Sequence, residues 1–233
     1  MKTIGELKME AKQVLKGRWG KAVLLNIIPT LLGIAVLFFV FLAGAVWFFF
    51  HGSGDSMVSS VSEYQQSNAS GGGTSLVSAI ISALFMSGIS WTYLDLLRGE
   101  RTEIDPFKDA FRGFQGVFLG GVILLAIITN IFISLWTLLF IIPGIVKTYA
   151  YTQSYFIYYD QIQTTGEKPK VLDTITASRR LMKGQKGRLF WLDLSFIGWH
   201  ILAILTIGIG YLWLNPYISA TKAAFYEDLQ NNL

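Results

Sequence analysis

The sequence predicts an all-α fold: a polytopic transmembrane helix bundle with about six spans, in hairpins preceded by short amphipathic interfacial helices. Hydrophobic residues make up 52% of the 233 residues and charged residues only 15%, whereas a typical soluble domain has about 25% charged residues. The apolar residues lie in runs long enough to cross a bilayer. Lysine and arginine gather between those runs, as in membrane proteins. We therefore expect one integral-membrane domain over residues 1–233.

The first element expected is a basic amphipathic helix within residues 1–21. Thr3 and Glu6 have the spacing of a capping box. Apolar side chains recur at helical spacing and leave lysines on the opposite side, so this helix should lie on the inner leaflet. The first span follows over residues 22–50. Because it exceeds the ~20 residues that cross a bilayer, we expect it to tilt or to bend near Pro29.

The next elements are a loop, a span and a second loop. Residues 51–75 are rich in serine, glycine, glutamine and asparagine, and we expect them to form a flexible external loop. The span over residues 76–97 has small residues at intervals of three or four, which favours close packing among other helices. In the loop 98–115, Asp105 followed by Pro106 is typical of a helix start.

The remaining spans become shorter toward the C-terminus. The third span covers residues 116–142 and ends at a Pro-Gly pair, and a second amphipathic helix is expected to begin at Val171 in the loop 161–188. The last three spans are expected at residues 145–159, 189–206 and 211–226. Because these are near or below the usual length, five spans with a re-entrant segment remain an alternative.

Three interfacial segments share one pattern. Each has an alanine, a large apolar residue four positions later, a glycine soon after, and then a span; the segments begin at Ala11, Ala110 and Ala177. The same design, an interfacial helix that leads into a membrane hairpin, is therefore expected three times.

The distribution of positive charge predicts the orientation. Residues 1–21 contain six Lys/Arg and residues 161–188 contain seven, whereas residues 51–75 contain none. Lysine and arginine are retained in cytoplasmic loops. We therefore expect a multi-pass protein of the cell membrane, with the N-terminus, the loops 98–115 and 161–188 and the C-terminus in the cytoplasm.

Three stretches closely resemble an uncharacterised bacterial integral-membrane family, domain of unknown function 975. They read LKGRWGKAVLLNIIP, IIPGIVKTYAYTQSYFIYYD and RRLMKGQKGRLFWLDLSFIGWHILAILTIGIGYLWLNPYISATKAAFYEDL. The resemblance covers most of the chain and implies a bacterial cytoplasmic-membrane protein. It carries over no catalytic residues.

Basic side chains beside the spans are the candidate lipid-headgroup residues. Anionic headgroups attract such clusters by about 1 kcal/mol per lysine or arginine near the surface. A phosphorylated ligand or a partner protein is the alternative. Nucleic acid is not expected, because its binding usually needs a folded soluble module or interleaved aromatic residues. The candidates are Lys12, Lys16, Arg18, Lys21, Arg179, Arg180, Lys183, Lys186 and Arg188.

Four polar side chains are candidates for a role inside the membrane: Asn130, Tyr151, Tyr155 and His200. An unpaired polar group in hydrocarbon costs several kcal/mol, so we expect Asn130 and His200 to face the bundle and find partners. Tyr151 and Tyr155 fall on one face of the expected span 145–159. They either pack in the interfacial aromatic belt, which we favour, or line a substrate path.

Charged residues within the expected spans lie close to span ends. These residues are Asp95, Lys147, Asp193 and Lys222. A charge in lipid is costly, but near a span end it is satisfied by snorkelling to the interface or by a local partner. None of the four therefore requires a proton relay.

Catalytic signatures are scarce. The chain has no cysteine and two histidines, and it contains no HExxH, GxSxG or P-loop motif, so we expect no metal site and no cofactor. The sequence favours a non-enzymatic membrane protein that binds lipid, moves a small solute or supports an envelope or export system. An intramembrane enzyme on a lipid or prenyl substrate, with His200 and Asp193 at its centre, is one alternative. A receptor or immunity factor for an extracellular peptide is the other, and a membrane-protein partner or a second copy of the chain remains open.

The orientation can be tested because the chain has no natural cysteine. A cysteine at Ser60, in the expected external loop, should react with a membrane-impermeant maleimide on intact cells. A cysteine at Thr165, in an expected cytoplasmic loop, should react only after lysis. The opposite labelling pattern would contradict the orientation.

Overall fold

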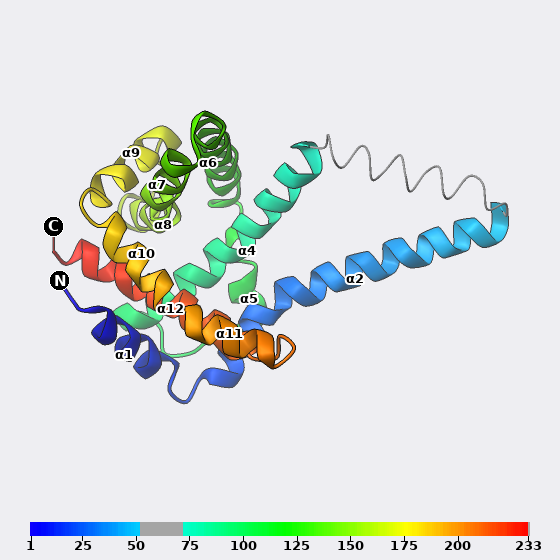
Figure 1. Ribbon diagram of the computed structural model, residues 1–233, viewed down its shortest axis with the longest axis horizontal. Coiled ribbons are helices and arrows are strands. Elements are labelled where there is room, and N and C mark those ends of the chain that lie inside the picture. Colours follow the sequence, from blue (N-terminus) through cyan, green and yellow to red (C-terminus); the bar gives the residue numbers. More distant parts are fainter. Residues whose placement is uncertain (52–71, 233) are drawn as a thin grey trace.

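The computed structural model describes residues 1–51 and 72–232, and within these residues the fold is all-α (Figure 1). Residues 52–71 of the expected external loop lie outside the described residues. The helices are α1 (Ile4–Leu15), α2 (Trp19–His51), α4 (Gly72–Arg98), α5 (Pro106–Ala110), a 3-10 helix (Arg112–Phe114), α6 (Leu119–Leu139), α7 (Ile141–Tyr151), α8 (Ser154–Thr165), α9 (Val171–Leu181), α10 (Lys186–Leu194), α11 (Ile197–Leu205) and α12 (Tyr211–Gln230).

Three stretches of the described residues are long and apolar enough to cross a membrane: Leu76–Arg98, Leu119–Leu139 and Lys186–Leu205. α2 adds a shorter apolar stretch, Trp19–Ala35. Large apolar side chains point outward on these helices; Phe49 of α2 is 90% exposed and Leu138 of α6 is 86% exposed. Such exposed surface fits contact with lipid. These spans indicate a multi-pass membrane protein.

The expectation of six spans is wrong. The expected span 145–159 is divided between α7 and α8, which have 11 and 12 residues. Each helix reaches about 17 Å, against about 30 Å of hydrocarbon. Neither α7 nor α8 is therefore a span by itself, and a return of the chain to the side on which α6 begins requires both helices in succession. The expected span 211–226 lies in α12, which has enough residues but is mostly buried and continues into Glu227 and Asp228. α12 therefore packs inside the protein instead of facing lipid.

A short helical segment precedes an apolar helix at each of the three places where the repeated pattern predicts one; that these segments lie at a membrane interface stays a prediction. α1 precedes α2, α5 and the 3-10 helix precede α6, and α9 precedes α10 and α11 (Figure 1). The capping box of Thr3 and Glu6 is present at the start of α1. The apolar stripe of α1, which includes the buried residues Leu7, Ala11 and Leu15, packs against α12. The apolar stripe is therefore covered by protein and is not available to insert into the inner leaflet, contrary to the expectation from the sequence.

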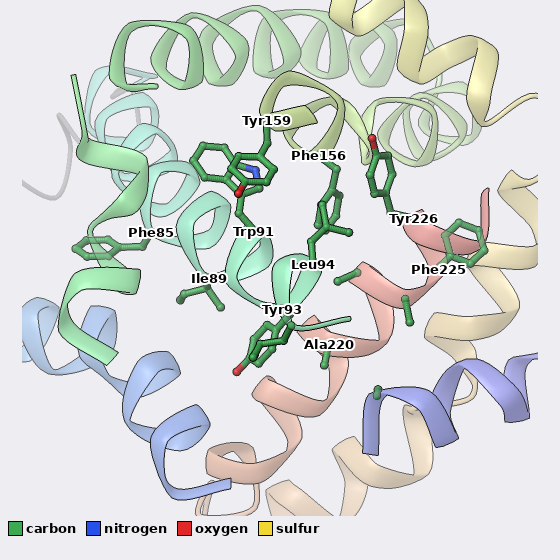
Figure 2. Packing of buried hydrophobic residues seen from close by; sticks show 14 of the residues in the cluster. Phe85, Ile89, Trp91, Tyr93, Leu94, Phe156, Tyr159, Ala220, Phe225 and Tyr226 are labelled. Atoms are coloured by element: carbon green, nitrogen blue, oxygen red, sulfur yellow. The ribbon is translucent and has the colours of Figure 1, made fainter. Parts of the chain in front are cut away.

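The core is built around α4, which packs against α6, α8 and α12. The ring of Trp91 on α4 stacks on Tyr159 of α8, with centroids 5.0 Å apart. Phe156 of α8 stacks in the same way on Tyr226 of α12, at 4.8 Å (Figure 2). The indole nitrogen of Trp91 also donates to the carbonyl oxygen of Tyr155 at 2.9 Å. Aromatic stacking therefore holds these three helices together.

A network of ion pairs connects the same three helices. Arg98, at the end of α4, donates from both terminal nitrogens to Asp160 of α8 at 2.7 and 2.9 Å. Its Nε donates to Glu227 of α12 at 2.8 Å. The hydroxyl of Tyr226 donates to Asp160 at 2.6 Å. One arginine thus pairs with acids from two other helices, in the bidentate geometry that makes such pairs strong.

A second arginine pairs with an acid on α4. Arg112 of the 3-10 helix lies 2.8 Å from Asp95, and both contact the hydroxyl of Tyr159. Burial raises the pKa of Tyr159 to about 12, so its hydroxyl remains protonated and donates to the carboxylate of Asp95. Asp95 therefore has a local partner, as the sequence predicts.

A third arginine joins the two ends of the chain. Arg188 of α10 donates to Asp228 of α12 and to the carbonyl oxygen of Lys2. The backbone nitrogen of Lys2 donates to Asp228 at 2.9 Å, and the amino group of Met1 donates to Asn232 at 3.0 Å. Both termini consequently lie on the same side of the protein.

The Arg98 pairs should dominate stability. Arg98→Gln leaves the carboxylates of Asp160 and Glu227 without their cation, and loss of one partner of a largely buried pair costs about 3 kcal/mol. Denaturant unfolding in a neutral detergent would measure the loss. Lys21→Gln is the matched control, because its pair with Glu103 is exposed and contributes less than about 1 kcal/mol. Equal effects of the two substitutions would contradict the central role of Arg98.

Candidate functional site

Side chains of α7, of α9 and its following turn, and of the start of α10 line an open surface pocket of about 280 Å³, which we call the basic hollow. Five of its seven lining residues are cations, and its lining contains no acid. Four of these cations were predicted from the sequence as lipid-headgroup candidates. The residues are Lys147, Ala150, Thr176, Arg179, Arg180, Lys183 and Lys186.

Local packing fixes the walls of the basic hollow. The buried hydroxyl of Ser178 on α9 donates to the carbonyl oxygen of Ala150 on α7 at 2.8 Å, which joins the two helices. The ammonium of Lys147 lies 4.4 Å from the ring centre of Trp136 on α6. After α9, Gly184 adopts a φ of 80°, a left-handed conformation that glycine tolerates, and the chain turns so that Lys186 reaches the hollow.

The five cations of the basic hollow are not neutralised within the part of the chain that the structure describes. No ion pair with a carboxylate forms at any of them in residues 1–51 and 72–232, whereas Arg98, Arg112 and Arg188 are all paired. Burial lowers the pKa of Lys147, and the positive charges of Arg179 and Lys186 lower it further. The hollow is therefore a concentrated positive field with room for an anion.

The other predicted lipid-headgroup residues are placed differently. Arg188 is paired with Asp228, and Lys21 with Glu103 at 2.8 Å. Arg18 donates to the carbonyl oxygens of Thr102 and Val14. Lys16 is exposed. Lys12 lines an apolar pocket of about 270 Å³, which is formed mainly by aromatic residues of α2, α11 and α12.

The polar residues predicted inside the membrane each have a neighbour. The amide of Asn130 donates to the carbonyl oxygen of Ala126 at 2.8 Å. Nδ1 of His200 lies 3.4 Å from the hydroxyl of Tyr211. Tyr151 belongs to α7 and packs near Phe132, whereas Tyr155 belongs to α8. The two tyrosines therefore lie on separate helices, not on one continuous span.

Two charges that the sequence assigns to span ends pair with each other. Asp193 of α10 lies 3.1 Å from Lys222 of α12. His200 lies near Tyr211, so His200 and Asp193 have different partners and do not form one centre. Groups of three or more His, Asp or Glu residues that could hold a metal ion do not occur among the described residues.

Sequence reasoning missed the Arg98 network and the place of Lys147 in the basic hollow. A signal for the acids that pair with Arg98, Arg112 and Arg188 was present: a tyrosine precedes such an acid by one or two positions on α4, α8 and α12. The pairs are Tyr93 and Asp95, Tyr159 and Asp160, and Tyr226 and Asp228. Each of these acids pairs with an arginine. No comparable pattern points to Lys147, because only the approach of α9 to α7 brings it to the hollow.

The fold defines a class: a multi-pass helical membrane protein with several candidate spans and an unpaired basic cavity beside one of them. The chain belongs to the family described as Protein of unknown function (DUF975), which matches residues 1–148 and 140–233. This confirms the family resemblance seen in the sequence. The comparisons with curated proteins and with solved structures gave no match.

The contact of His200 predicts a structural role for this residue. His200→Leu removes one long hydrogen bond in a half-buried position, so unfolding should become easier by about 1 kcal/mol or less. The variant should still insert into the membrane and elute as a monodisperse species. It should also complement any phenotype that deletion of the gene causes. A well-folded His200→Leu protein that fails this complementation would contradict the structural role.

Proposed function

We propose that this protein is a non-enzymatic membrane protein that binds anionic lipid headgroups at the cytoplasmic face of the cell membrane. The observation that carries the proposal is the basic hollow. Five cations line it, and none of its lining residues among those that the structure describes is an acid. By contrast, Arg98, Arg112 and Arg188, which connect helices of the core, are each paired with an acid. Unpaired cations beside a membrane attract anionic headgroups.

The position of the basic hollow supports a lipid ligand. Lys186 lines the hollow and is also the first residue of the candidate span Lys186–Leu205. The end of a span lies at the level of the headgroups. Anionic headgroups would therefore reach the hollow without entering the protein.

The distribution of charge supports the cytoplasmic side. The segment 161–188, which supplies most cations of the hollow, has seven Lys/Arg and two acids. The amino group of Met1 donates to Asn232, next to the last residue, so both ends of the chain lie on the same side of the membrane in this proposal. Lysine- and arginine-rich segments favour the cytoplasmic side.

A non-enzymatic role is favoured over the enzyme hypothesis. The residues that an intramembrane reaction centre would use, His200 and Asp193, contact Tyr211 and Lys222 instead of each other. Catalysis by acid and base groups needs those groups to converge on one substrate. Lipid binding needs only the charge and the location that the basic hollow has.

The proposal is tested with the triple variant Arg179→Gln, Arg180→Gln and Lys183→Gln. At about 1 kcal/mol per cation, its affinity for phosphatidylglycerol should fall on the order of 100-fold, measured by native mass spectrometry of the protein in neutral detergent. Lys168→Gln with Lys170→Gln is the control, because both lysines lie in the same loop, are exposed and do not line the hollow. Unchanged binding by the triple variant would refute the proposed function.

A further inference from the structure

The charge of the basic hollow exceeds what a single monoanionic headgroup can neutralise. Five cations surround about 280 Å³, and the lining adds the hydroxyl of Thr176 but no acid. A phosphodiester headgroup such as phosphatidylglycerol carries one negative charge. A phosphomonoester carries about −1.5 to −2 at neutral pH and has three terminal acceptor oxygens. The second ligand class matches the hollow better in charge and in acceptors.

The donors of the basic hollow also fit a phosphomonoester. Arg179 and Arg180 contribute two planar guanidinium groups, which bind phosphate oxygens in a bidentate manner. Lys147 of α7, Lys183 of the turn after α9 and Lys186 at the start of α10 contribute point charges. The donors thus come from more than one helix and could contact several oxygens of one group.

The volume of the basic hollow matches a small polar group. Its volume of about 280 Å³ corresponds to about nine water molecules, at about 30 Å³ each. A phosphate group with part of a glycerol and some water fits this space. An acyl chain does not, and would remain in the bilayer beside the span that begins at Lys186.

We propose that the basic hollow is a selective site for a phosphomonoester group, which is presented either by a lipid headgroup or by a soluble phosphate ester. The inference rests on the proposed function and narrows its ligand class. It assigns Arg179 and Arg180 as the principal phosphate ligands and Lys147 as the cation that closes the site from α7.

Selectivity is measured with the purified full chain in neutral detergent. Phosphatidic acid, the phosphomonoester lipid, should bind about tenfold more tightly than phosphatidylglycerol with the same acyl chains, since it carries up to one further charge. Arg179→Gln with Arg180→Gln should remove most of this preference, whereas Lys168→Gln with Lys170→Gln should preserve it. Size-exclusion elution and melting temperature would establish that each variant is folded.

A pH titration of the unmodified protein gives a second test that needs no variant. Phosphomonoesters lose their second charge below a pKa of about 6. The preference for phosphatidic acid over phosphatidylglycerol should therefore be present at neutral pH and decline as the pH falls through that range. A preference that persists at low pH would overturn the charge-based selectivity.

A soluble ester separates the two sources of the phosphate group. Glycerol 3-phosphate that competes with phosphatidic acid would assign the site to soluble phosphate esters; phosphatidic acid binding without such competition would assign it to lipid. Equal affinity of the unmodified protein for the two lipids would overturn the inference. The proposed function would still stand if the variant Arg179→Gln, Arg180→Gln, Lys183→Gln bound both phosphatidic acid and phosphatidylglycerol more weakly than the unmodified protein does. If this variant bound both lipids as tightly as the unmodified protein, the proposed function and the inference would both fail.

Discussion

The guanidinium of Arg98 is the interaction on which the arrangement of the helices depends. It lies between Asp160 and Glu227, so one side chain fixes α4, α8 and α12 relative to one another. Moving such charges out of water costs several kcal/mol per ion, and only good geometry and further hydrogen bonds repay that cost. The bidentate contact with Asp160 and the hydroxyl of Tyr226 provide both. The apolar exterior can then face lipid while the charges remain inside.

Hydrogen bonds connect the helix that holds Asp160 with the helices that line the basic hollow. Gln161 follows Asp160 on α8, and its side chain accepts a hydrogen bond from Thr174 of α9 at 3.1 Å. Further along α9, Ser178 bonds to the backbone of α7 at Ala150. One hydrogen bond thus fixes α9 against α8, and another fixes α9 against α7. Side chains of both α7 and α9 line the hollow. A core network of paired charges supports a surface site of unpaired ones.

The sequence predicts the elements whose signals are local. The capping box at Thr3, the helix start at Pro106 and the apolar stretches of α4 and α6 require only neighbouring residues, and all are present. The ion pairs depend on distant partners; Arg98 and Glu227 are 129 positions apart. Hydropathy likewise could not show that α12 is buried by protein, because an apolar stretch facing lipid and one facing other helices have similar compositions.

In the amphipathic helices of this protein, the basic side indicates which residues are available to a ligand, whereas the apolar stripe does not. A stripe such as that of α1 or α9 predicts a boundary between apolar and polar surroundings but does not identify the apolar side as lipid. In this protein, α12 covers the stripe of α1, and α6, α7 and α8 pack on α9. What α9 presents to the surroundings is Arg179 and Arg180, and the positive charge of Arg179 repels that of Lys147. An anion bound there, as we propose, would stabilise the folded state and with it the packing of α9 on α7.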